Sequence, residues 1–200
     1  MSLPPENPAA TALGAAAVQP EFSREERALL LKLAHEAIET AVNQRELTLF
    51  PVSAHLVEAR GAFTTLYLEG ELRGCVGYVL PVVPLYRTVA ESAKAAALDD
   101  MRFSPVTPAE VPLLEVVLSI LSPLRPIMPE QVEVGRHGLV VTLGMRRGLL
   151  LPQVPVEHSW DRETYLCQTC RKAGLPSDAW QQGAVLEAFT AEIFGDRDLV

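Results

Sequence analysis

The hydrophobic pattern of this chain changes its period several times, and the order of these changes limits the folds open to it. Apolar residues recur at helical spacing over 30–41 and again over 85–98. Apolar or β-branched runs of strand length lie at 62–68, 72–79, 116–121, 138–143 and 149–151. The helices alternate with strands that are linked as hairpins, and no repeating β-α-β order is present. We therefore expect an α+β fold with mainly antiparallel sheets. The run 116–121 is almost wholly apolar, which predicts a central strand covered on both faces.

Local signals mark the ends of several of these elements. Ser23 and Glu26 have the spacing of a capping box, so the first helix should begin there, with His35 on its solvated face. Asp161 favours the start of a later helix, and Gly174 is the expected left-handed residue after it. The last apolar stretch, 184–193, suits a strand by position, although its spacing also suits a helix.

Composition and charge restrict the class of function. The chain has 200 residues, enough for one large domain or two small ones, and residues 1–20 are rich in alanine and proline, which predicts a flexible N-terminal arm. Acidic residues outnumber basic ones 25 to 17, and the net charge of −8 disfavours nucleic acid. Three cysteines and no apolar run long enough to span a bilayer predict a cytoplasmic protein with reduced thiols and no membrane contact.

The most unusual segment is Leu-Arg-Gly-Cys-Val-Gly at 72–77, which places two glycines inside a strand. Such glycines mark a bulge or the close approach of another group. On a regular strand Arg73 and Cys75 share a face, and a guanidinium beside a thiol favours the nucleophilic thiolate. The alternative is that Cys75 is a small buried residue and that Gly74 and Gly77 serve a twisted hairpin. The sequence leaves both interpretations open.

Three further groups of residues are candidate sites. Asp99, Asp100 and Arg102 follow a helix end, where carboxylates oppose the helix dipole, so they mark either a site or a local ion pair beside a buried Phe103. Cys167 and Cys170 have redox or zinc spacing, but only one such pair is present, and Cys170 shares a helix face with core residues. His137 and its neighbour Arg136 offer contacts to an anion. We expect no metal and no bound cofactor.

These residues resemble the AMMECR1 family over roughly residues 22–194. The segment 72–77 resembles the signature hexapeptide of the family, with valine in place of the usual isoleucine. Further resemblance, in the same order, lies at 102–107, 135–138, 147–154, 160–161 and 169–175. At the position of Cys170 the family commonly has a cysteine alone, so Cys167 is an addition of this chain.

The resemblance implies an α+β domain over 21–196 with a larger and a smaller subdomain, the smaller built from the middle of the chain. It also implies action with Memo-like and radical SAM proteins in a modification or metabolic pathway, because family members are often encoded beside such proteins or fused to them. The activity of the family is unsettled. Our leading hypothesis places the site at 73–77, with Cys75 as the catalytic residue and, as ligand-binding residues, Arg73, Gly74, Gly77, Arg102 and His137.

Two other classes of function fit the same residues. A non-catalytic interaction module would use this surface to bind a protein, and it requires a broad, shallow patch where an enzyme requires a concave pocket. An RNA-binding protein would need its arginines to converge on one face, namely Arg73, Arg102, Arg136, Arg146 and Arg147.

Overall fold

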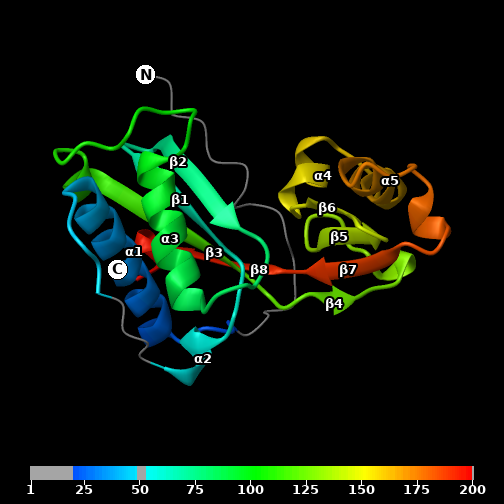
Figure 1. Ribbon diagram of the computed structural model, residues 1–200, viewed down its shortest axis with the longest axis horizontal. Helices are drawn as coiled ribbons and strands as arrows, with labels where there is room; N and C mark the ends of the chain where they lie inside the picture. Colours follow the sequence, from blue (N-terminus) through cyan, green and yellow to red (C-terminus); the bar gives the residue numbers. More distant parts are fainter. Residues whose placement is uncertain (1–19, 49–52, 200) are drawn as a thin grey trace, which may run out of the picture.

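The computed structural model describes residues 20–48 and 53–199, which form two lobes side by side along the long axis of the molecule (Figure 1). Each lobe has its own four-stranded antiparallel sheet and its own helices, so the predicted α+β class is confirmed. Apart from its last residue, the arm predicted for residues 1–20 lies outside the described residues. Among the described residues, no helix combines the length and the apolar character needed to cross a membrane.

The first lobe is built from both ends of the described chain. Its sheet has the strand order β2-β1-β3-β8. Its elements are α1 (Arg24–Val42), α2 (Ala54–Val57), β1 (Ala62–Leu68), β2 (Glu71–Tyr78), α3 (Leu85–Leu98), the 3₁₀ turn η2 (Val111–Leu113), β3 (Leu114–Leu121), β8 (Ala191–Gly195) and the 3₁₀ turn η5 (Asp196–Asp198).

Helices α1 and α3 lie next to one another over one face of this sheet (Figure 1). The predicted capping box is present, because the Ser23 hydroxyl accepts from the Glu26 amide at 3.2 Å and the Glu26 carboxylate accepts from the Ser23 amide at 3.1 Å. Helix α3 is rich in alanine and buries Ala93 and Ala96 in the core of the lobe. Such small side chains allow the helix backbone to come close to the strands.

Strand β3 is central, as predicted, and pairs with β1 on one side and with β8 on the other. The prediction that both of its faces are covered is wrong for most of its length. Leu114, Val116, Leu118 and Ile120 face the helices and are buried, whereas Val117 and Ser119 on the other face are only half-buried. An unbroken apolar run therefore forms a strand with only one covered face here. The hydrophobic periodicity does not distinguish a strand covered on one face from a strand covered on both.

The polar side of α1 is less solvated than its pattern suggested. His35 Nε2 lies 3.0 Å from Asp196 Oδ2, and the same oxygen accepts from the Val116 amide at 2.8 Å. The histidine thus joins α1 to β3 and to the C-terminal turn η5. This contact spans 161 residues of sequence, so helical periodicity alone could not reveal it.

The second lobe is one continuous segment with the strand order β4-β7-β5-β6. Its elements are β4 (Arg125–Pro126), the 3₁₀ turn η3 (Pro129–Gln131), β5 (Gly138–Leu143), β6 (Arg146–Leu150), α4 (Gln153–Glu157), α5 (Arg162–Lys172), the 3₁₀ turn η4 (Ala179–Gln181) and β7 (Val185–Phe189). Gly144 and Met145 alone form the loop between β5 and β6, which is shorter than the gap between the predicted strand runs 138–143 and 149–151.

Helix α5 has the predicted ends. The Asp161 carboxylate accepts from the Thr164 amide at 2.8 Å, and Gly174 has a φ of +71°. Its buried Tyr165 places the phenolic oxygen 3.0 Å from the carbonyl oxygens of both His137 and Leu150. This tyrosine therefore ties the helix to the sheet beneath it, and burial raises the pKa of its hydroxyl.

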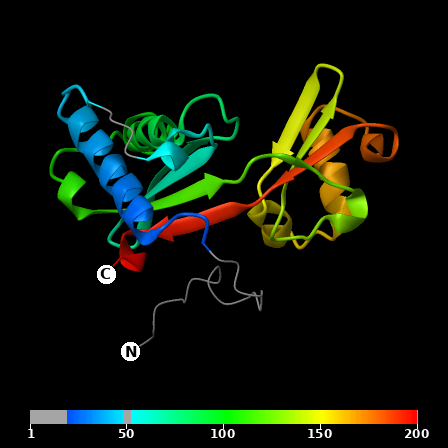
Figure 2. The ribbon, with the colours of Figure 1, turned by 90° about the horizontal axis from the view of Figure 1, so that it is seen from below.

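Two chain segments cross between the lobes, one after β3 and one between β7 and β8 (Figure 2). They are bonded to each other, because the Ser122 amide donates to the Thr190 carbonyl at 2.9 Å and the Thr190 amide donates to the Ser122 hydroxyl at 3.0 Å. The stretch 184–193 thus contains parts of two strands and no helix. Its Leu186 belongs to the core of the second lobe and Phe189 to the junction, whereas Ile193 is 65% exposed.

A first prediction concerns the Tyr165 hydroxyl. Replacing it (Tyr165→Phe) should lower the free energy of unfolding by about 1–2 kcal/mol, because the partly buried carbonyl groups of His137 and Leu150 lose this donor. Urea unfolding measures the difference. The control is Tyr78→Phe, since Tyr78 is 43% exposed and its hydroxyl bonds to no described residue; an equal loss in both variants would contradict the assigned role of Tyr165.

Candidate functional site

The hexapeptide 72–77 lies on β2, at the edge of the first-lobe sheet. One face of this strand packs under α3, and the other faces away from the helices (Figure 1). Gly74 is buried on the side of the helix, whereas Arg73 and Cys75 are half-buried and alternate with it. Cys75 therefore lies opposite the helical layer. The register of β2 against β1 shifts between Gly74 and Leu72, so Arg73 has no partner on β1 and the regular strand assumed for a face shared with Cys75 is interrupted there.

Packing within the first lobe explains both glycines. A Cβ at Gly74 would collide with the carbonyl oxygen of Ala96 on α3, and a Cβ at Gly77 would collide with the ring of Phe63 on β1. The space beside Gly74 is thus occupied by the backbone of α3, and the space beside Gly77 by the ring of Phe63. In this structure neither glycine leaves room for a ligand at its Cα.

The segment after α3 is bonded to the edge of β2 through Cys75. Its amide donates to Asp100 Oδ2 at 2.8 Å, and Arg102 Nη2 donates to its carbonyl oxygen at 3.3 Å. Arg102 also pairs with Asp100 at 2.7 Å, so the local ion pair that the sequence offered as an alternative to a site is present. These bonds, that from Arg102 above all, hold the pKa of the Asp100 carboxyl well below its usual range. Phe103 is half-buried, and its ring centre lies 5.4 Å from the Arg102 guanidinium carbon.

Arg73 is engaged within the chain. Its Nε donates to Glu110 Oε1 at 2.9 Å and its Nη1 donates to the Ser104 carbonyl at 2.8 Å, and its side chain is only 13% exposed. Glu110 also accepts from the amide of Thr107 at 2.7 Å. Arg73, followed by this amide, lowers the pKa of Glu110 to about 2. The predicted ligand-binding arginine thus already holds a carboxylate.

The thiol of Cys75 is free and half-buried. The Thr65 hydroxyl donates to its sulfur at 3.3 Å from the opposite position on β1. None of the four histidines is bonded to it: His35 pairs with Asp196, His55 with Glu26, His137 accepts from Glu133, and His158 stacks on Trp160. The described residues therefore place a hydroxyl donor, and no imidazole base, at this sulfur.

His137 lies in the other lobe and is separated from the rest of the predicted site. It lines a cavity of about 340 Å³ at the junction, together with Arg136 and Arg125. Its Nδ1 accepts from the Glu133 amide at 3.1 Å, and burial lowers the pKa of its imidazole. A second cavity of about 180 Å³ lies beside α1, and neither is lined by Cys75 or Arg73.

The other two cysteines belong to the second lobe. Cys170 is buried with Leu166 and Ala173 in the core, as predicted, and burial raises the pKa of its thiol. Cys167 is half-buried. Over residues 20–48 and 53–199, no three histidine, cysteine or acidic side chains gather as they would around a metal ion.

Sequence reasoning missed the partners of the motif. Thr65 could have been found from the hairpin, because an antiparallel pairing of 62–68 with 72–79 brings it near Cys75. Glu110 could not, since 37 residues separate it from Arg73. Arg125 showed no signal, because its role depends on how the two lobes meet.

The molecule is thus a two-lobed α+β protein whose glycine-containing motif lies on an edge strand and is held there by the segment after α3. The AMMECR1 family matches residues 31–194, and the chain belongs to this family. The resemblance noted in the sequence is thereby confirmed.

Relatives of known sequence or structure agree with this assignment. Protein TK0174 of Thermococcus kodakarensis is 42% identical over 179 residues, which cover 82% of this chain and 87% of that protein. A protein of Methanothermobacter thermautotrophicus is 42% identical over 183 residues, covering 86% of this chain and 95% of its own length. The crystal structure of the uncharacterized protein PH0010 from Pyrococcus horikoshii shares 40% identity with a TM-score of 0.68, over 84% of this chain and 89% of that one.

A second prediction tests the close contact at Gly74. The variant Gly74→Ala should lose about 3 kcal/mol of unfolding free energy, because its methyl group must displace the backbone of α3. Gly70 is the control: it has open space around its Cα and a φ of +85°, so Gly70→Ala should lose only about 1 kcal/mol. A smaller loss at Gly74 than at Gly70 in urea unfolding would refute the packing explanation.

A third prediction concerns acid. Because Arg73 lowers the pKa of Glu110 to about 2 from an ordinary 4.5, this pair stabilises the fold above pH 4.5 and loses its effect as the pH falls toward 2. Glu110→Gln should therefore unfold about 1–2 kcal/mol more easily than the parent at pH 7 and no more easily near pH 2. Unfolding in urea across this range measures the difference. The same change at exposed, unpaired Glu157 should have no effect, and a constant difference at Glu110 would exclude the ion pair as its cause.

Proposed function

We propose that this protein is a binding module of a modification or metabolic pathway, which engages Memo-like and radical SAM proteins through the edge of β2 around residues 73–77. The choice of partners rests on the resemblance to the AMMECR1 family. The choice of surface rests on one observation: the backbone of the edge strand is bonded at Cys75 and open at Gly77.

The open backbone follows from the register of the hairpin. The amide and carbonyl of Cys75 point away from β1, since they bond to Asp100 and Arg102. Gly77 is two residues further along a regular part of the strand, so its amide and carbonyl point toward the same edge. No loop or side chain of the described residues bonds to them. An exposed strand edge of this kind accepts an extended segment of another protein.

Exposed apolar side chains follow Gly77 along the chain. Tyr78 is 43% exposed, Leu80 47% and Val82 77%. A run of apolar residues that accompanies unpaired backbone groups suits contact with a protein, because the backbone supplies hydrogen bonds and the side chains supply buried area. We call Gly77, Tyr78, Leu80 and Val82 the β2 edge surface.

The charges near the motif favour a protein partner over a free anion or RNA. Arg73 pairs with Glu110 and Arg102 with Asp100, so neither guanidinium is available to an anionic ligand without losing a carboxylate. The arginines that RNA binding would require are divided between the lobes, and one of them, Arg147, also pairs with a glutamate. Their arrangement gives RNA binding no support.

Thiol chemistry at Cys75 is the second candidate function. It is favoured by the 3.3 Å hydrogen bond from the Thr65 hydroxyl, since a donor to sulfur stabilises a thiolate. The Arg102 guanidinium bonds to the Cys75 carbonyl oxygen and to Asp100 instead, which leaves the thiol without a paired cation.

A fourth prediction tests the β2 edge surface. Leu80→Lys should weaken binding of the purified Memo-like or radical SAM protein of the same genome at least about tenfold, because it places a solvated charge against an apolar contact. Biolayer interferometry measures the dissociation constant. Ile193→Lys is the matched control, since Ile193 is 65% exposed on β8 at the opposite edge of the same sheet. Unchanged affinity of Leu80→Lys for both proteins, or equal losses in both variants, would reject the surface.

The variant Cys75→Ala separates the two candidate functions. A binding module should keep the parent affinity and full function of the pathway in cells that carry this variant. Loss of pathway function with unchanged affinity would instead assign chemistry to the thiol. Thermal unfolding confirms beforehand that the variant is folded.

A further inference from the structure

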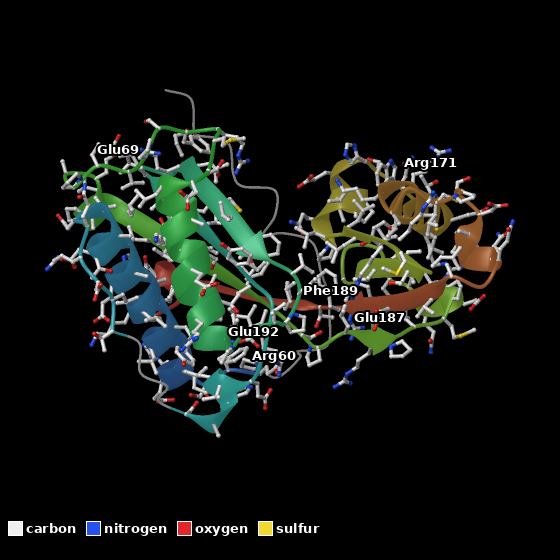
Figure 3. All side chains as sticks on the ribbon, in the orientation of Figure 1. Arg60, Glu69, Arg171, Glu187, Phe189 and Glu192 are labelled. Atoms are coloured by element: carbon white, nitrogen blue, oxygen red, sulfur yellow. The ribbon has the colours of Figure 1, made fainter. Side chains whose placement is uncertain are left out.

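The cavity at the junction of the lobes has features that the β2 edge surface does not use. Its volume of about 340 Å³ is that of a small-ligand site. It lies where β4 and β7 leave the crossing segments, and Phe189, at the junction end of β7, forms part of its wall (Figure 3). The walls therefore come from the second lobe and from the segments that connect it to the first.

Two arginines that line this cavity are not held by a strong ion pair within the described residues. The Arg125 side chain is exposed and forms no hydrogen bond or ion pair with any described residue. Arg136 pairs with Glu133 at 3.0 Å, but both side chains are more than half exposed, at 52% and 57%, so this pair is weak and exchangeable. In a chain with a net charge of −8, two arginines on one cavity form a local positive region.

His137 adds a directed donor to this region. Because its Nδ1 accepts from the Glu133 amide at 3.1 Å, the neutral imidazole carries its proton on Nε2. Nε2 has no hydrogen-bond partner among the described residues and is thus available to a ligand. Tyr165 lies 3.0 Å from the His137 carbonyl oxygen and holds the backbone in place.

The remaining wall of the cavity is apolar. Pro126 and Ile127 follow Arg125 along the chain, and Phe189 faces them from β7. Phe189 is itself held in position, because Gly138 leaves space for its ring and a Cβ there would collide with it. The cavity thus combines a cationic part with an apolar part.

We propose that this cavity binds a small phosphate monoester with an apolar or aromatic body. At neutral pH such a monoester carries close to two negative charges, which two guanidinium groups match, whereas a carboxylate carries one. The imidazole donates to a third phosphate oxygen, and Pro126, Ile127 and Phe189 cover the body of the ligand. This site is separate from the β2 edge surface, so either proposal can fail without the other.

Isothermal titration calorimetry on the full chain tests the proposal with four probes: phenyl phosphate, inorganic phosphate, benzoate and phenol. Phenyl phosphate should bind at least about tenfold more tightly than each of the others, since it alone combines the dianion with an aromatic body. Its affinity should fall as salt is added. Absence of binding at millimolar phenyl phosphate, or equal affinity for benzoate, would overturn the proposal.

Three variants locate the binding. Arg125→Gln removes a charge that supports nothing else in the described fold, and it should weaken phenyl phosphate about tenfold. His137→Asn keeps an acceptor for the Glu133 amide but removes the Nε2 donor, and it should also weaken binding. Arg171→Gln removes an equal charge from the last turn of α5, on a far part of the same lobe, and should change nothing (Figure 3). Equal effects of Arg125→Gln and Arg171→Gln would reduce the result to nonspecific attraction and refute the site.

Discussion

Helix α3 lies so close to β2 that no side chain fits at Gly74, and the arrangement of the motif depends on this contact. The helix ends at Leu98, and its position over the strand brings Asp100 to the amide of Cys75. The same segment then presents carbonyl groups of Ser104 and Pro105 to Arg73. A larger residue at position 74 would lift the helix and with it every one of these partners. The glycine therefore positions the partners of the motif through its contact with the helix.

Several ion pairs join segments that lie far apart in the sequence. Arg27 binds Glu192 at 2.9 Å and thereby connects α1 to β8, near the labels of Glu192 and Arg60 in Figure 3. Arg60 is almost fully buried and pairs with Glu21, 39 residues before it, as well as with the neighbouring Glu58. An exposed ion pair contributes little to stability, whereas a buried pair is costly to break. The structural role of these pairs is to hold segments that are distant in the sequence in a fixed position relative to one another.

Local chemistry could be predicted from the sequence wherever it acts within a few residues. The capping box at Ser23, the end of α5 at Gly174, the helix at 85–98 and the pair of Arg102 with an aspartate all depend on short spacings. The partners of Arg73 and His35 could not be predicted, because they come from segments that only the tertiary fold brings near. The glycines show the same limit: their presence indicated a close approach, but only the structure identifies Ala96 and Phe63 as the groups that approach.

The order of strands along the chain has a consequence for synthesis. Every strand of the second lobe lies within one continuous stretch, from β4 to β7, whereas β8 follows that stretch and completes the sheet of the first lobe beside β3. A ribosome therefore releases all of the second lobe before the first lobe can close, and until then β3 lacks one neighbour. The hydrogen bonds between Ser122 and Thr190 hold the two ends of the inserted stretch together. Strand β8 therefore begins next to β3, the strand with which it pairs.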